Sequence, residues 1–169
     1  MQRPLENEYA SFYKNYIALA TGNNINDVIV NHNRTISKFY SNLPEEKADY
    51  AYAEGKWTIK DLLQHLIDAE RIFVYRATRF ARKDNQSLLG FEENDYAQNA
   101  NAITRTLQSL KEELSALRKS TNLFLENLND DQLAQNGAAN NNLITVNAIA
   151  FIIFGHLLHH KNIIEERYL

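Results

Sequence analysis

The 169-residue sequence predicts an all-α protein, a four-helix bundle with a short additional N-terminal helix and long connecting loops. Glycine and proline are scarce, at 5 and 2 residues, and the β-branched alternation of strands is almost missing. Apolar residues instead recur at steps of three and four along several segments, as they do in helices that share a core. A chain of this length is expected to form one domain, residues 1–169, with its bundle core at about 25–169.

The first half of the chain contains start and stop signals for three helices. A short N-terminal helix is expected near 5–19, before the sequence TGNN breaks the chain. The first core helix follows at 25–43, where Asn24 and Asp27 have a capping-box-like spacing, and it ends at Pro44. The second core helix starts at Thr58, capped reciprocally by Asp61, and runs to about residue 82.

The second half contains the most regular apolar pattern, at 103–128, where core positions alternate steps of four and three. The last helix is expected to begin after Thr145, a plausible N-cap, and the asparagine-rich NGAANNN before it breaks the chain. The connections are longer than tight helical turns, so they leave room for a crossover and can wall a pocket at one end of the bundle. These predicted loops are 44–57, 84–101 and 129–143.

Composition excludes several kinds of function. Cysteine is absent, which rules out thiolate catalysis, disulfides and cysteine-ligated metals and agrees with a cytoplasmic location. No window approaches the roughly 20 apolar residues of a membrane span, and the N-terminus lacks the apolar run of a signal peptide. A net charge of −3 provides no basic footprint. We therefore expect neither a nucleic-acid partner nor a membrane partner.

Three of the five histidines lie within five positions of the closing segment, FIIFGHLLHHKNIIEERYL. At about 100° per helical residue, His156 and His160 lie in the middle of the apolar stripe, and His159 lies on its flank. His65 of the second core helix also shares an inward, apolar face. We expect His159 to be a neighbour of the site or a surface group, and His32 to be a partly buried packing residue.

A neutral imidazole in an apolar seam needs partners for its nitrogens, and a lone one is usually a hydrogen-bonded core histidine. Three inward histidines are explained more simply by one shared metal ion, although a histidine–carboxylate network remains open. All-imidazole ligation suits zinc, nickel or iron. The spacing of His156 and His160 is that of a zinc metalloprotease helix, but Leu157 stands where that motif requires a glutamate, which argues against such a peptidase.

The stretch GKWTIKDLLQHLIDAERIFVYRATRFARKD, followed by LLGF and the terminal GHLLHHKNIIEERYL, resembles the DinB-like (YfiT-like) superfamily of metalloenzymes over about residues 25–169. Its most specific markers are Trp57 before a histidine-bearing helix and the final GH-x-x-HH. The resemblance implies a four-helix bundle with a divalent metal on His65, His156 and His160, the three residues that helical spacing also selects. It implies neither polymerase activity nor DNA binding.

Three neutral histidines leave coordination positions open for water or substrate, as in catalytic sites. The resemblance implies a metal-dependent enzyme that acts on a small molecule, either as a thiol S-transferase with a low-molecular-weight thiol or as a hydrolase. The alternative is a non-catalytic metal-binding scaffold for stress response or ligand binding. A plain bundle that serves only for oligomerisation is a weaker third possibility.

Two carboxylates are candidate catalytic residues because a proton-shuttling group would help any of these reactions. Asp68 lies three residues beyond His65 and could flank the metal, although a surface pairing with Arg71 is the competing interpretation. Glu92, with its neighbour Glu93, could reach over the pocket from the 84–101 loop, although loop acids are usually solvated.

Other residues receive structural expectations. Arg76 lies on the His65 face, and we expect it to have a carboxylate partner rather than to anchor a substrate. Trp57 is expected to pack as a hydrophobic staple, with a role as pocket wall, shared with Tyr96, as the alternative. The aromatic residues of the N-terminal helix exceed what one edge helix needs and predict a homodimer; they are Tyr9, Phe12, Tyr13 and Tyr16.

Overall fold

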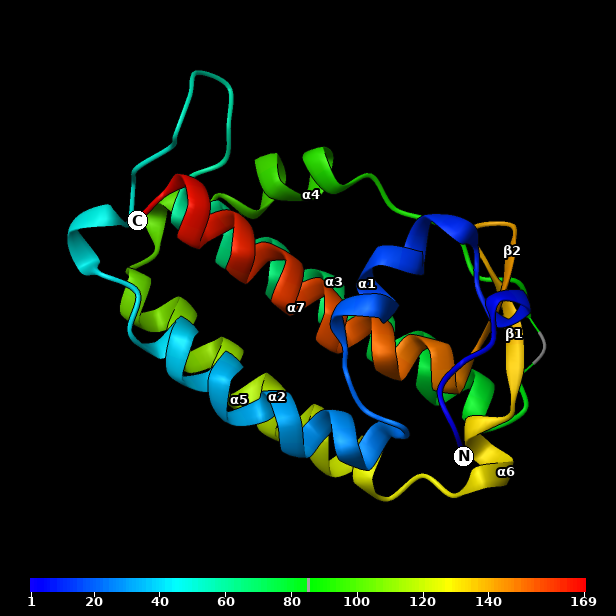
Figure 1. Cartoon of the computed structure of the whole chain (residues 1–169). Helices are drawn as coiled ribbons and strands as arrows, with labels where there is room; N and C mark the ends of the chain where they lie inside the picture. The colour runs from blue at the N-terminus through cyan, green and yellow to red at the C-terminus, as the bar shows by residue number, and fades with distance from the viewer. Residues whose placement is uncertain (85) are drawn as a thin grey trace.

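Four long helices dominate the computed structural model, which describes residues 1–84 and 86–169 (Figure 1). Helices α2 and α3 each contact both α5 and α7, so the four helices form a square in cross-section. Helices α3 and α5 run in the same direction because the chain between them returns along the bundle (Figure 1). The predicted four-helix bundle is confirmed, including a crossover connection. The bounds are α2 Ile25–Ser41, α3 Ile59–Ala81, α5 Leu107–Glu126 and α7 Val146–Arg167.

Side-chain caps start the helices where the sequence predicts them. The Thr58 hydroxyl accepts a hydrogen bond from the Asp61 amide, and the Asp61 carboxylate accepts one from the Thr58 amide, which completes the capping box of α3. The Thr145 hydroxyl likewise accepts from the Ala148 amide at the start of α7. Each cap pairs a backbone donor that the helix itself leaves without a partner. Correct caps fix the register of the two helices that carry the inward histidines.

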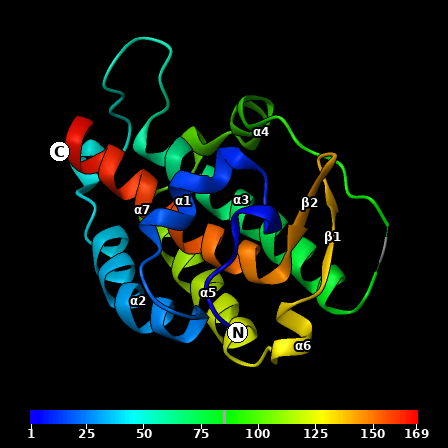
Figure 2. The same ribbon diagram turned by 45° about the vertical axis from the view of Figure 1, so that its right-hand side comes forward.

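Apart from Asn147, helix α7 is apolar on every side from Val146 to Gly155, and its residues are buried without a break from Val146 to Leu158. It is enclosed by α2, α3 and the short α1 (Lys14–Leu19), which lies across it in Figure 2. A Cβ at Gly155 would overlap the backbone carbonyl of Tyr16, so α1 can approach only because this residue is glycine. Among the described residues, no helix is both long and apolar enough to cross a membrane.

The N-terminal helix is shorter than predicted. Instead of one helix over 5–19, the chain forms 3₁₀ turns at Glu6–Glu8 and Ser11–Tyr13, and then α1. Tyr9 and Ala10 between the turns have extended backbone. The recurrence of aromatic residues at 9, 12, 13 and 16 resembles a helical pattern and therefore does not reveal the extended backbone at Tyr9 and Ala10.

The predicted loop at 84–101 contains a helix, α4 (Glu93–Ala100). Its acidic first turn favours helix initiation, and it ends at Asn101 in a left-handed conformation with φ of 52°. Ala97 is the one residue of α4 that is buried, so an apolar stripe that would reveal the helix in the sequence is missing. Helix α4 lies alongside α3 over one edge of the bundle (Figures 1 and 2).

The predicted break at NGAANNN is a β-hairpin, which an all-α prediction missed. Strands β1 (Asn136–Ala139) and β2 (Asn142–Thr145) pair antiparallel after the one-turn helix α6 (Asp130–Leu133). The two turn residues, Asn140 and Asn141, have φ values of 49° and 61°, as a tight hairpin turn requires. Leu88 exchanges backbone hydrogen bonds with this hairpin and so holds the crossover against it.

Helix α5 begins four residues later than the apolar pattern suggests. Ile103 lies in a 3₁₀ turn, Ala102–Thr104, and is 60% exposed. The Thr106 hydroxyl accepts a hydrogen bond from the Ser109 amide and caps the helix at that point. The local cap, rather than the extent of the apolar periodicity, determines where the helix starts.

Candidate metal centre

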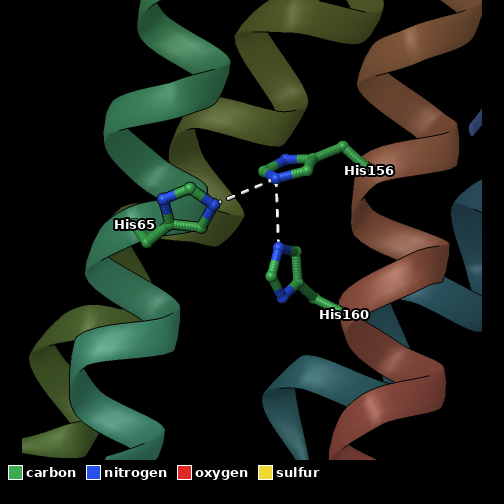
Figure 3. A group of neighbouring side chains, drawn as sticks. All are labelled: His65, His156 and His160. Atoms are coloured by element: carbon green, nitrogen blue, oxygen red, sulfur yellow. Dashed lines mark hydrogen bonds between the residues drawn. The ribbon is translucent and has the colours of Figure 1, made fainter. Parts of the chain in front are cut away.

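Three histidine side chains meet inside the bundle, His65 from α3 and His156 and His160 from α7 (Figure 3). The Nε2 atom of His156 lies 3.0 Å from Nε2 of His65 and 3.1 Å from Nε2 of His160. One ring nitrogen from each residue lies within 4.8 Å of the others. The structure therefore brings together the three residues selected by the sequence, on neighbouring helices.

Burial keeps all three imidazoles neutral. Loss of hydration lowers the pKa of His65 to about 4. Burial, together with repulsion from His65 and His159, lowers the pKa of His160 to about 3. The pKa of His156 is also held well below its ordinary value, by burial first and by repulsion from the other histidines second. At neutral pH each ring therefore has one nitrogen lone pair available to a ligand.

The donor set fits a divalent metal ion better than it fits hydrogen bonding within the cluster. Two Nε2 atoms face the single Nε2 of His156, and one proton there can satisfy only one of the two contacts well. The Nδ1 atom of His160 is also buried without a hydrogen-bond partner in the described part of the chain. Nitrogens bound to one tetrahedral zinc at about 2.0–2.1 Å lie roughly 3.3 Å apart, close to the observed separations.

Aromatic side chains pack against the His65 and His156 rings. The Trp57 ring lies 4.8 Å from the His65 ring, and Tyr16 and Phe73 lie 5.5 and 6.0 Å from the His156 ring. Of the two expectations for Trp57, the structure supports the pocket wall, since Trp57 lines a cavity together with His160. The other proposed wall residue, Tyr96, packs instead on Phe91.

The histidine cluster borders two cavities, and α4 contributes to both. The first, which we call the aromatic cavity, has a volume of about 320 Å³ and reaches His156. The second has a volume of about 260 Å³ and reaches His160. Glu93 lines the first cavity and its neighbour Asn94 lines the second. Small molecules can therefore approach the histidines from two sides, as an open coordination site requires.

The two candidate acids occupy different surroundings. Asp68 accepts a hydrogen bond from Gln64 at 3.0 Å and lies 3.8 Å from Arg71, the arrangement of the competing surface-pair interpretation. Glu92 precedes α4 as its N-cap residue, and both Glu92 and Glu93 are exposed. Glu93 differs in lining the aromatic cavity, where partial loss of hydration, followed by repulsion from Glu92, raises its pKa. Glu93 is therefore the better placed of the two neighbouring loop acids.

Arg76 departs from its expectation. It is 5% exposed and lines the aromatic cavity, where it donates a hydrogen bond of 2.9 Å to the Leu89 carbonyl and lies beside the Tyr13 hydroxyl. Among the described residues, no carboxylate lies within ion-pairing distance of its guanidinium group. The expected carboxylate partner is thus missing from the described structure, and a buried cation faces the cavity next to the histidines.

The sequence did not place the aromatic residues Tyr13 and Tyr16 at the site. Both line the aromatic cavity, as does their neighbour Phe12, which is 59% exposed. Their abundance had suggested a homodimer surface, which remains a prediction. The available signal was Gly155 beside His156, since a glycine within a buried helix often marks the close approach of another backbone.

The two remaining histidines lie outside the cluster. The Thr21 amide donates a hydrogen bond of 3.0 Å to Nε2 of His32, on the first core helix, and burial lowers the pKa of His32. His159 is partly exposed, with its ring 5.2 Å from that of Tyr16. Both placements agree with the roles expected from helical spacing.

Comparison with known proteins supports the same picture. The family model described as the DinB superfamily matches residues 30–164. The structure is similar to YfiT from Bacillus subtilis, described as a probable metal-dependent hydrolase with an unusual four-helix bundle topology, with a TM-score of 0.72 and 16% identity over 97% of this chain and 90% of that one. At that identity the likeness shows the fold alone, and no curated protein matches significantly. Because the family match spans most of its length, this chain belongs to the DinB superfamily.

Proposed function

We propose that this protein is a metal-dependent hydrolase of a small molecule, with His65, His156 and His160 as the metal ligands. The observation that carries the proposal is the convergence of three Nε2 atoms at a point bordered by two cavities. The similar structure of YfiT, described as a probable metal-dependent hydrolase, supports this choice over a thiol transferase. A divalent zinc, nickel or iron ion supplies a Lewis acid that polarises a carbonyl group and acidifies water.

The residues of the chain perform the remaining tasks. Tyr16, Phe73 and Trp57 surround the histidine rings and limit access of bulk water. The carboxylate of Glu93 takes a proton from the attacking water and returns it to the leaving group as the scissile ester or amide bond breaks. Its raised pKa suits both halves of this transfer, because the group accepts and releases a proton nearer to neutral pH.

Metal content tests the first part of the proposal. Untagged protein is stripped with a chelator, reconstituted separately with zinc, nickel and ferrous iron, dialysed, and analysed by mass spectrometry. We expect about one equivalent for the wild type and less than about a tenth for His65→Ala. His159→Ala is the matched control, a neighbouring histidine outside the cluster, and should keep its full metal content. Equal metal content in His65→Ala and wild type would exclude the site.

Turnover tests the second part. Each metal form is assayed with ester and amide substrates, and in parallel with glutathione plus an electrophile. We expect hydrolysis that depends on metal, is lost in His65→Ala, and falls about 10²-fold or more in Glu93→Gln. Thiol transfer without hydrolysis would assign the protein to the other enzyme class. Metal-dependent melting without turnover in either assay would favour the non-catalytic scaffold.

A further inference from the structure

We propose that the aromatic cavity binds a carboxylate group of the substrate through the guanidinium group of Arg76. The proposal rests on the proposed function only in assigning the ligand to a hydrolytic substrate. The expected substrate is an ester or amide with a free carboxylate group and an apolar body between that group and the scissile bond.

The positive charge of Arg76 has no anion at ion-pairing distance to balance it in the described part of the chain. A buried guanidinium is costly unless an anion compensates it, and arginine remains protonated at any ordinary pH. Arg76 is 5% exposed, and its guanidinium donates to the Leu89 carbonyl and lies beside the Tyr13 hydroxyl, two neutral groups that do not balance its charge. Within residues 1–84 and 86–169 no carboxylate compensates it at ion-pairing distance. A ligand anion in the cavity would supply the missing charge.

The aromatic cavity extends from Arg76 to the histidine cluster. Arg76 follows His65 by eleven residues on α3, or about 16 Å along the helix axis. Ala69 and Phe73 lie between them and line the same cavity, which reaches His156 at its other end. Helical side chains lean toward the N-terminus, so the guanidinium lies nearer to the histidines than its backbone does. One elongated molecule can therefore contact both ends.

The chemistry of the walls favours a carboxylate over a phosphate. A single guanidinium matches the planar, singly charged carboxylate in a two-pronged hydrogen bond. Glu93 lines the same cavity, and its negative charge would repel a dianion more strongly than a monoanion. The remaining walls are mostly aromatic, including Tyr13, Tyr16 and Phe91, and suit an apolar body.

The test measures binding to protein freed of metal with a chelator, so that a carboxylate cannot bind through a metal ion. Isothermal titration uses 3-phenylpropionate as the probe, with neutral 3-phenylpropanamide and phenyl phosphate as comparison ligands. We expect saturable binding of 3-phenylpropionate, weakened about tenfold or more in Arg76→Gln, and little binding of the amide. Arg71→Gln, a matched arginine that is exposed on the same helix and paired with Glu113, should bind as the wild type does.

Two further variants separate anion binding from a structural role. Glu93→Gln removes the neighbouring negative charge, so we expect it to bind 3-phenylpropionate more tightly than the wild type. Arg76→Lys keeps the positive charge but loses the planar fork, so its affinity should fall between those of wild type and Arg76→Gln. This second variant keeps the test decisive if Arg76→Gln does not fold.

Equal affinity of wild type and the Arg76 variants for 3-phenylpropionate, or equal binding of the amide, would overturn the proposal. Tighter binding of phenyl phosphate than of the carboxylate would overturn the assignment of ligand class. The two proposals fail separately. If the protein binds 3-phenylpropionate through Arg76 but takes up no metal, the carboxylate site stands and the proposed hydrolase function fails. If it catalyses metal-dependent hydrolysis but binds no carboxylate, the hydrolase function stands and the carboxylate site fails.

Discussion

The Nε2 atoms of His65 and His156 lie 3.0 Å apart, so a proton between them can belong to only one ring. The Nε2 atom of His160 lies 3.1 Å from the same nitrogen of His156 and competes for the same space. Protonation of any ring would place a buried positive charge against two neighbouring nitrogens. The same arrangement that directs three nitrogen lone pairs at a cation therefore makes the metal-free protein sensitive to acid.

We predict that metal-free protein loses stability as the pH falls below about 6.5. The pKa values of His65 and His160 are lowered by burial to about 4 and about 3, whereas histidines of the unfolded chain titrate near 6.5. Between these values the unfolded state binds more protons, so the free energy of unfolding rises with pH. The expected slope is about 1.4 kcal/mol per pH unit for each such histidine.

Urea unfolding between about pH 4.5 and 7.5 measures this slope. Metal-free His65→Gln should lose the contribution of one proton and give a shallower dependence than the wild type. His32→Gln is the comparison: burial also lowers the pKa of His32, but less than that of His65, so this variant should change the slope less. Identical slopes for wild type and His65→Gln would contradict the prediction.

We predict that Gly155→Ala destabilises the protein by about 1–3 kcal/mol, despite the higher helix propensity of alanine. The added Cβ would overlap the Tyr16 carbonyl and push α1 away from α7. Tyr16 would then lose its contact with the His156 ring. Urea unfolding measures the loss of stability. The variants Asn162→Ala and Asn162→Gly, at an exposed position of the same helix, give the reference difference in unfolding free energy between alanine and glycine. Unchanged or increased stability would show that α1 shifts without cost.

The histidine cluster and the helix caps could be predicted because they depend on local geometry. Helical rotation places His156 and His160 on one stripe, and the capping box of Thr58 needs only residues within one turn. The type I′ hairpin was also signalled locally, since asparagine tolerates positive φ and two of them occupy the turn at 140–141. In the sequence alone these asparagines predict only a break in the chain, which a tight hairpin turn also satisfies.

The roles of Arg76 and Glu93 could not be predicted in the same way. Whether a buried arginine has a partner depends on every element that packs around it, and the crossover that carries Leu89 and α4 has no apolar pattern to fix its path. The position of Tyr16 depends similarly on a close approach between α1 and Gly155. These side chains line the cavity because of packing between segments distant in the sequence, which residue type alone does not predict.

We predict that Arg3→Met loosens α1 and the aromatic cavity wall. The Arg3 guanidinium donates hydrogen bonds of 2.7, 2.6 and 2.8 Å to the carbonyls of Ile17, Ala20 and Gly22, at the end of α1 and just beyond it. Methionine keeps much of the apolar stem but loses these charged donors, at an expected cost of about 2 kcal/mol. Hydrogen exchange of the α1 amides should accelerate, while the exposed control Arg34→Met leaves it unchanged. Equal exchange rates in both variants would contradict this anchoring role.

Glu70 and Arg118 are charged residues buried at the centre of the bundle. Their side chains form an ion pair of 2.9 Å between α3 and α5, and each is less than 5% exposed. Arg118 also donates to Asn122, which in turn donates to Asn33 of α2, and it lies 4.6 Å from the Phe154 ring of α7. One arginine thus connects all four helices of the bundle.

Arg118→Met leaves the Glu70 carboxylate buried without a partner and should cost about 3–5 kcal/mol. The double variant Glu70→Leu with Arg118→Met removes both charges, so we expect it to be more stable than the single Arg118→Met variant. Urea unfolding of wild type, the two single variants and the double variant gives the coupling energy between the residues. A double variant whose destabilisation equals the sum of the two single losses would show that the pair is not coupled. The desolvation of an unpaired charge would then not explain the cost of losing Arg118.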